Sequence, residues 1–278
     1  MKHVRSESDA FSLMRMQTVN ILGAQKIALL AERMQAKSHF CVSTDKSVNS
    51  VNLMGASKRL MEAFVFDSTE RTPSITARFA NVAFSDGSLL NGFQQRFLRR
   101  QPIAVPKDVK RYFFTDIESG RLCLLAAVLG GHAEIFVPKE SNELKLTSFV
   151  DVLERFLHEQ GYEMFLCSNE NEARDRGPEL IKGGKWPCLV SISDTTGEKK
   201  YEEFKGNERV VIPDRFETVQ VLKHPGDITT QMLGEFKRKI LALRASGVWS
   251  KADILDCYRC VLNDFMHEEL DKFLDEKM

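Results

Sequence analysis

The sequence predicts an α/β protein in which a parallel sheet carries helices on both faces and a mainly helical C-terminal extension follows. Three short apolar runs, at residues 40–42, 74–79 and 134–137, have the length and composition of buried parallel strands. Segments with apolar residues at helical spacing separate these runs. A chain of 278 residues, 43% of them apolar, is long enough for one large domain or for a domain with an appendage.

The remaining elements follow in chain order. Helices are expected at residues 7–36, 53–65, 117–129 and 144–160, with about three more within 229–277. The helix at 117–129 is apolar almost all round, so we expect it to be buried. Residues 101–105 are bounded by prolines, which favours an edge strand. A polar stretch after residue 160 predicts a boundary between a domain at 1–160 and an extension at 161–278, with short strands before its helices.

Polar residues follow the first apolar run directly, as Ser43, Thr44, Asp45 and Lys46. In open α/β sheets ligands bind at the carboxyl ends of the strands, because the strand fixes the position while the loop carries the chemistry. Asn49, Ser50 and Asn52 then read as loop and N-cap residues before the next helix. By itself, an adjacent Asp-Lys pair is more typical of a solvated turn than of a catalytic site.

Composition excludes several functions. Lys+Arg and Asp+Glu both number 39, so we expect neither nucleic acid nor an anionic membrane as the main partner. The N-terminal residues lack the apolar core of a secretory signal and no apolar run could span a bilayer, which predicts a cytoplasmic protein without membrane insertion. Cys257 and Cys260 form a lone C-x-x-C with no second ligand pair, so no metal site is expected.

Two motifs carry a resemblance to a known family. Residues 43–46 read STDK and residues 54–58 read MGASK, which together resemble the active-site segment of nucleotide-sugar 4,6-dehydratases. These enzymes form the CapD-like polysaccharide biosynthesis branch of the extended short-chain dehydrogenase/reductase superfamily, and UDP-N-acetylglucosamine is the expected substrate. Met54 stands where most of that superfamily has a tyrosine, as it does in large dehydratases of this branch. The departure removes the usual phenolic base.

The resemblance assigns catalytic roles to five residues. It implies that Lys46 takes the C5 proton of the sugar, that Asp45 protonates the C6 hydroxyl and that Thr44 holds the C4 oxygen. Met54 occupies the tyrosine position, and Lys58 would bind the nicotinamide ribose. A base lysine needs a pKa lowered toward neutrality, and an acid aspartate needs a raised pKa.

Other residues receive binding roles from the same resemblance. Ser43 and Asn20 would serve the cofactor site, although Asn20 also reads as a polar residue on a helix surface. The segments RFANV and KRYFFT imply that Asn81 and Arg111 bind the substrate, and the loop after RFANV implies the same for Ser85 and Ser88. Without the resemblance, Ser88 or Asp86 reads as an ordinary helix cap and Arg111 as a surface arginine.

The resemblance also implies a Rossmann-like sheet that is truncated here. In the family, a stretch matched by Lys2, His3 and Val4 follows a first half with a glycine-rich phosphate loop, and the 278 residues contain no such motif. NAD or NADP is the implied cofactor, and activity alone is expected to be impaired. The implied partners are a UDP-sugar and either a second copy of the chain or a complementary N-terminal half. A C4 epimerase and a non-catalytic remnant or partner subunit remain alternatives.

Overall fold

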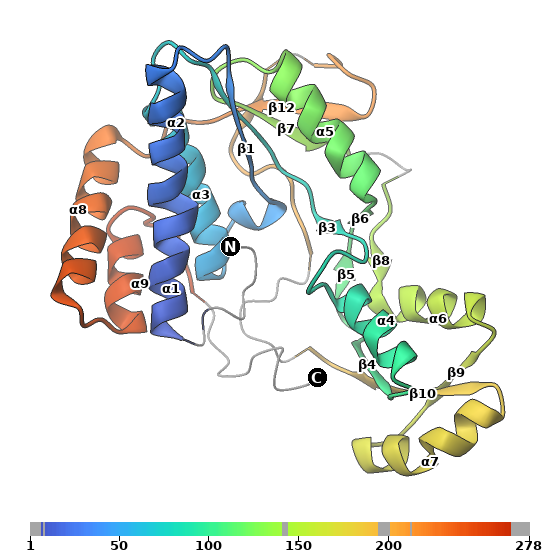
Figure 1. Ribbon diagram of the computed structural model, residues 1–278. Helices are drawn as coiled ribbons and strands as arrows, with labels where there is room; N and C mark the ends of the chain where they lie inside the picture. The colour runs from blue at the N-terminus through green and yellow to red at the C-terminus, as the bar shows by residue number, and fades with distance from the viewer. Residues whose placement is uncertain (1–6, 8, 141–143, 194–200, 212, 268–278) are drawn as a thin grey trace.

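A computed structural model describes residues 7, 9–140, 144–193, 201–211 and 213–267, so residues 2–4 of the predicted motif lie outside it. Its largest sheet has five strands in the order β1-β2-β7-β12-β11 (Figure 1). They are β1 (His39–Val42), β2 (Ser74–Ala77), β7 (Glu134–Pro138), β12 (Val219–Lys223) and β11 (Arg209–Val210). The first three run parallel, whereas β12 and β11 each pair antiparallel. Among the described strands β1 pairs with β2 alone, so it forms an edge.

Helices cover both faces of this sheet, as predicted for the fold class. They are α1 (Ala10–Gln17), α2 (Ala24–Arg33), α3 (Leu53–Asp67) and α5 (Asp116–Leu129). A π-helical turn, Thr18–Gly23, joins α1 and α2 into the single long helix that the sequence predicted. Ile135 and Val137 on β7 pack with α2 and α3, while the intervening Phe136 packs with α5. The alternation places apolar side chains of one strand in two cores.

The helix α5 corrects one prediction. Its sequence is apolar almost all round, yet Ile117, Leu124 and Val128 are 62%, 66% and 69% exposed. Only one side of the helix, including Leu122 and Ala126, contacts the sheet. An apolar composition therefore predicted the wrong environment for the other side, because composition does not determine which faces of a helix are covered.

A second, three-stranded parallel sheet has the order β4-β10-β9. Its strands and the helices beside it are β4 (Ile103–Pro106), β9 (Glu163–Leu166), β10 (Lys185–Ser191), α4 (Leu89–Leu98), α6 (Phe149–Glu159) and α7 (Glu170–Lys182). The strand β4 is at an edge, as the prolines predicted. Two strand pairs complete the region: β3 (Asn81–Val82) with β6 (Phe113–Phe114), and β5 (Lys110–Arg111) with β8 (Thr147–Ser148). Because β8 precedes α6, the helix expected at 144–160 begins only at Phe149.

Two C-terminal helices, α8 (Thr230–Ser246) and α9 (Lys251–Arg259), lie beside α1 and α2 in Figure 1. Gly247 ends α8 with a left-handed φ of 74°, a conformation that glycine adopts without strain. The expected third helix falls partly on residues 268–278, outside the described residues. Both sheets combine strands from the two sides of residue 160, and the division there stays a prediction. No described helix is both long enough and apolar enough to cross a bilayer.

Candidate functional site

The loop after β1 is compact and buried. Thr44 caps a short 3₁₀ helix, Asp45–Ser47, and its hydroxyl donates a hydrogen bond to Asp45 Oδ1 at 2.6 Å. The Asp45 side chain is 2% exposed, and Lys46 Nζ lies 3.4 Å from its Oδ1. The Asp-Lys pair is therefore not the solvated turn that the residue types alone favour. It is an ion pair at the carboxyl end of a parallel strand.

A glycine brings this loop against α3. A Cβ atom on Gly55 would lie 2.1 Å from the backbone oxygen of Lys46, so only glycine fits without movement of the backbone. Asn52 caps the helix, because its Oδ1 accepts a hydrogen bond from Gly55 N at 2.7 Å. The MGASK motif thus sets the distance between the loop and the helix that carries Lys58.

Two predicted cofactor residues lie where β1 ends. Lys58 Nζ donates to the backbone oxygen of Val42 at 3.1 Å, and burial lowers the pKa of Lys58 despite opposing charge from Cys41 and Glu62. The Ser43 hydroxyl is buried and has no hydrogen-bond partner among the described residues. A buried polar atom without a partner costs free energy, so a ligand that bonds Ser43 would relieve that cost. This end of the site fits a nicotinamide ribose.

The next two predicted site residues are Asn20 and Met54. Asn20 is buried on the π-helical turn, not on a helix surface, and its Nδ2 donates to Ser57 Oγ at 2.9 Å. Ser57 donates in turn to the backbone oxygen of Met54 at 2.7 Å. Asn20 therefore supports the first turns of α3, next to Lys58. The Met54 side chain is also buried, and its backbone N–H donates to Glu7 Oε1 at 2.9 Å.

The carboxylate of Glu202 joins residues that the sequence analysis assigned separately to catalysis and binding. Asn81 Nδ2 donates to its Oε1 at 2.8 Å, and Arg111 Nε lies 3.2 Å from the same oxygen. Lys46 Nζ is 3.4 Å from Oε1. We call Asp45, Lys46, Asn81, Arg111 and Glu202 the Glu202 cluster. Arg111 is buried within it, so the alternative of a surface arginine is wrong.

Sequence reasoning missed Glu202. The residue stands in a charged stretch between apolar neighbours, YEEF at 201–204, with no motif around it. Its buried position depends on the return of the chain to β3 and β5 across more than ninety residues. The available signal was Phe204, whose aromatic side chain in a polar stretch predicts a buried anchor, but that signal carries no chemistry.

Charge in the Glu202 cluster shifts two pKa values. Burial, with repulsion from Asp45, raises the pKa of Glu202 to about 7 despite the attraction of Lys46 and Arg111. Burial alone would lower the pKa of Lys46, but the carboxylates of Asp45 and Glu202 outweigh it, so the pKa is raised. The raised value is opposite to what a lysine base requires.

The loop with Ser85 and Ser88 lies at the start of α4 and is held by local hydrogen bonds. Ser88 is the N-cap of α4, and its Oγ accepts from Asn91 N at 3.1 Å. The backbone oxygen of Ser85 accepts from Ser88 N at 2.9 Å. The ordinary helix-cap interpretation of Ser88 is therefore confirmed, and its substrate role stays a prediction.

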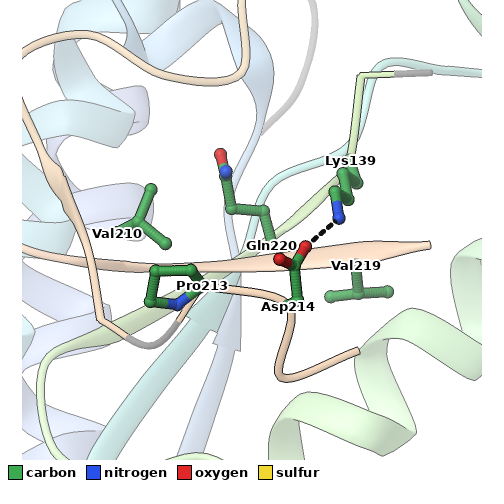
Figure 2. Close-up of a pocket in the computed structure, with 6 residues that line it drawn as sticks. All are labelled: Lys139, Val210, Pro213, Asp214, Val219 and Gln220. Carbon is green, nitrogen blue, oxygen red and sulfur yellow. Dashed lines mark hydrogen bonds and ion pairs between the residues drawn. The ribbon is translucent and has the colours of Figure 1, made fainter. Parts of the chain in front are cut away.

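A surface pocket at the other side of the sheet is a poorer candidate. Figure 2 shows its lining from β7, β11, β12 and the turn between the last two, namely Lys139, Val210, Pro213, Asp214, Val219 and Gln220. Its one ion pair joins Lys139 to Asp214, whose side chain is 81% exposed. An exposed pair of this kind is well solvated, and Lys139 lowers the pKa of Asp214, whereas burial raises the pKa of Glu202 to about 7. Functional chemistry is better placed in the cluster.

Comparison with known proteins gives a family for most of the chain. The sequence pattern of the family described as "Polysaccharide biosynthesis protein" matches residues 1–180. The chain is 29% identical over 197 residues to the probable polysaccharide biosynthesis protein EpsC of Bacillus subtilis, covering 62% of this chain and 32% of that protein. It is 34% identical over 140 residues to the capsular polysaccharide biosynthesis protein CapD of Staphylococcus aureus, covering 49% and 23%. The chain thus spans about a third or less of these relatives.

Two further similarities concern an enzyme and a fold. A UDP-glucose 4-epimerase of Rickettsia felis is 26% identical over 201 residues, covering 70% of this chain and 51% of the epimerase. The X-ray structure of Pen from Bacillus thuringiensis superposes with a TM-score of 0.60 at 20% identity, covering 81% of this chain and 63% of Pen. At that identity the likeness shows the fold, which is the Rossmann-like arrangement that the sequence predicted.

Proposed function

The chain belongs to the polysaccharide biosynthesis protein family, and from this premise we propose that it takes part in the 4,6-dehydration of a UDP-N-acetylhexosamine. The supporting observation is the Glu202 cluster, in which an acid, an amine, an amide and a guanidinium converge at the carboxyl ends of the sheet strands. Dehydration needs an acid and a base beside the same sugar, and the cluster holds both kinds of group.

Proton transfers can be assigned to this chain's own residues. Lys46 would take the C5 proton, Asp45 would protonate the C6 hydroxyl as it leaves as water, and Thr44 would hold the C4 oxygen. Lys46 is held as an ammonium ion by two carboxylates, so it must first give its proton to one of them before its neutral amine can take the C5 proton. The site therefore has to exchange a proton within the cluster before the sugar reacts.

A nicotinamide dinucleotide, NAD or NADP, would supply reversible hydride transfer when bound. Ser43 and Lys58 are the residues that would hold its ribose end, because the Ser43 hydroxyl has no partner among the described residues and Lys58 lies beside it on α3. We propose that a further dinucleotide-binding part, within a longer polypeptide or in a partner chain, pairs along the edge strand β1.

Substrate binding would use Arg111 and Asn81. A guanidinium suits the diphosphate of a UDP-sugar because its donors match phosphate oxygens, and the amide of Asn81 suits a sugar or phosphate oxygen. A C4 epimerase is the second candidate, since an epimerase is among the relatives. Epimerisation requires oxidation at C4 and return of the hydride to the other face of the same carbon, whereas the Asp45–Lys46 pair adds the groups that elimination needs.

Mass spectrometry of UDP-N-acetylglucosamine after incubation with the protein and NAD tests the proposal. With the proposed dinucleotide-binding part supplied in the assay, we expect a product lighter by one water, formed by the wild type and by the control variant Lys37→Ala, which changes an exposed lysine. The Lys46→Ala variant should form no such product. A product with unchanged mass but inverted at C4 would support the epimerase instead, and water loss that persists in Lys46→Ala would contradict the assigned base.

A further inference from the structure

The Glu202 cluster is completed by a residue from outside the segment that the family pattern matches. That pattern ends at residue 180, whereas Glu202 lies in the stretch before β11. Its side chain is 2% exposed and accepts from four donors that lie earlier in the chain. The fourth donor is the backbone N–H of Tyr112, 3.2 Å from Oε2. Both carboxylate oxygens are therefore used.

The stretch around Glu202 is firmly attached to the fold. Phe204 is 1% exposed and lies between the rings of Tyr112 and Phe114, at centroid distances of 5.3 and 6.2 Å. Arg78, the first residue after β2, donates to the backbone oxygen of Phe204 at 3.4 Å and to Glu208 Oε1 at 2.6 Å. Buried attachments at Phe204 and at Glu208 hold the stretch that carries Glu202 against the fold.

We propose that Glu202 is a positioning residue of the site: its carboxylate orients Asn81 and Arg111 and holds Lys46 as an ammonium ion. Three side-chain donors on different elements converge on Oε1 of Glu202, and one shared acceptor couples their positions. The inference rests on the proposed function only in regarding these donors as binding and catalytic groups. The charge relation between Glu202 and Lys46 is independent of it.

Charge balance explains why an acid is needed here. The titratable groups that face Glu202 are Asp45, Lys46, Arg111 and Tyr112. Without Glu202, Lys46 would keep the Asp45 carboxylate but lose the contact with Oε1, and Arg111 would lose its contact with the same oxygen. Burial of a cation with less balancing charge is costly. Glutamine at position 202 would still accept hydrogen bonds through one oxygen, but it would bring no charge. The variant Glu202→Gln therefore removes the charge of the side chain while it keeps the shape.

The test follows the reactivity of Lys46 toward trace acetic anhydride as the pH rises, because only the neutral amine reacts. Competitive labelling yields the midpoint of this rise separately from the accessibility of the amine, and the exposed Lys37 serves as internal reference. Removal of a carboxylate at this distance lowers a lysine pKa by about one unit or more. We expect Glu202→Gln to lower the Lys46 midpoint by about one pH unit.

Glu203→Gln is the matched control, since Glu203 is the exposed neighbour that accepts from Asn49 at 3.0 Å. It should leave the Lys46 midpoint unchanged. If Glu202→Gln does not fold, the shorter side chain of Glu202→Asp moves the carboxylate away from Lys46 and should lower the Lys46 midpoint by a smaller amount. A wild-type midpoint in a folded position-202 variant overturns the proposal. The labelling uses no nucleotide-sugar and no cofactor, so an absence of dehydratase activity would count against the proposed function alone.

Discussion

Two buried charge clusters attach the stretch 201–208 to the rest of the chain, and they differ in what their charges do. In the Arg78 cluster, made of Glu62, Arg78 and Glu208, contacts are short: Arg78 Nε to Glu62 Oε1 is 2.8 Å and Nη1 to Glu208 Oε1 is 2.6 Å. In the Glu202 cluster the contacts with the carboxylate range from 2.8 to 3.4 Å. The short, paired contacts of the Arg78 cluster indicate a structural role. The longer contacts of the Glu202 cluster leave room for a proton to move between its groups.

The pKa values separate the two clusters in the same way. Burial would raise the pKa of Glu208, but Arg78 outweighs it and the pKa is lowered. In the Glu202 cluster burial and the neighbouring Asp45 dominate, and the pKa of Glu202 is raised to about 7. One carboxyl is therefore held firmly ionised, while the other changes its charge near neutral pH. Groups poised in this way are typical of acid–base sites.

The largest expected effect comes from breaking the Arg78 cluster. Arg78→Ala would leave Glu62 and Glu208 buried without their cation, which typically costs about 3–5 kcal/mol. Urea unfolding should show this loss. Arg59→Ala is the control, because Arg59 pairs with the half-exposed Asp227 and Asp264 and should lose less than about 1 kcal/mol. Equal losses in both variants would refute the distinction between structural and surface pairs.

The pH dependence of stability should separate Glu202 from Glu208. Because the pKa of Glu202 is raised in the folded state, its contribution to folding stability is fully present below the unfolded-state pKa of 4.5. That contribution is lost as the pH rises toward about 7. The loss is on the order of 3 kcal/mol, and Glu202→Gln should remove it. The lowered pKa of Glu208 has the opposite sign, with stability lost as the pH falls below 4.5.

Chemical unfolding of wild type, Glu202→Gln and Glu208→Gln across this range measures both slopes. Glu202→Gln should flatten the decline between about pH 4.5 and 7, and Glu208→Gln should flatten the acid side. If Glu202→Gln left the slope between these values as in the wild type, the carboxyl would not titrate there and the comparison of clusters would fail.

A smaller effect should follow from Gly55→Ala. The added methyl group would meet the backbone of Lys46, and an overpacked contact costs about 1–3 kcal/mol. Gly120→Ala on α5 is the control, because a Cβ there meets nothing within 4 Å and helix propensity favours alanine by up to about 1 kcal/mol. Thermal unfolding should therefore move in opposite directions for the two variants. A stabilised Gly55→Ala would contradict the close approach of loop and helix.

The smallest expected effect concerns Ser88. Loss of its cap on α4 through Ser88→Ala should cost about 1 kcal/mol of folding free energy. If Ser88 serves only as a cap, UDP should bind the variant as it binds the wild type, measured by calorimetry below the unfolding temperature. A clear loss of UDP affinity would instead support the substrate role that the resemblance implies.

Local rules predicted much of the fold. Helical spacing and the Asn52 cap placed α3 correctly, and a short apolar run followed by polar residues placed β1 and its loop. The cap formed by Ser88 was also predicted by local rules, because a capping serine is defined by its immediate neighbours. Side-chain identity could not show that α5 leaves Ile117 and Val128 exposed, since coverage of a helix depends on what packs against it.

The candidate site was predicted only in part. The STDK and MGASK motifs identified Asp45, Lys46 and Lys58, because these residues lie on one strand–loop–helix unit. Glu202 was not predicted, because its role depends on contacts with residues far away in the sequence, such as Lys46. The raised pKa of Lys46 was not predicted either, because it depends on Glu202 as well as on the adjacent Asp45. Local sequence thus shows which groups are present, and tertiary structure determines their charge.

The most direct test of the account is a calorimetric titration of UDP into the wild type, Arg111→Ala and Arg59→Ala. Arg111 lies in the Glu202 cluster, whereas Arg59 pairs with acids at the surface of the molecule. The account predicts equal binding by the wild type and Arg59→Ala, and at least about tenfold weaker binding by folded Arg111→Ala, as expected for a lost charge-assisted contact. Equal binding by all three proteins, or binding by none, would contradict a nucleotide-sugar site at the Glu202 cluster.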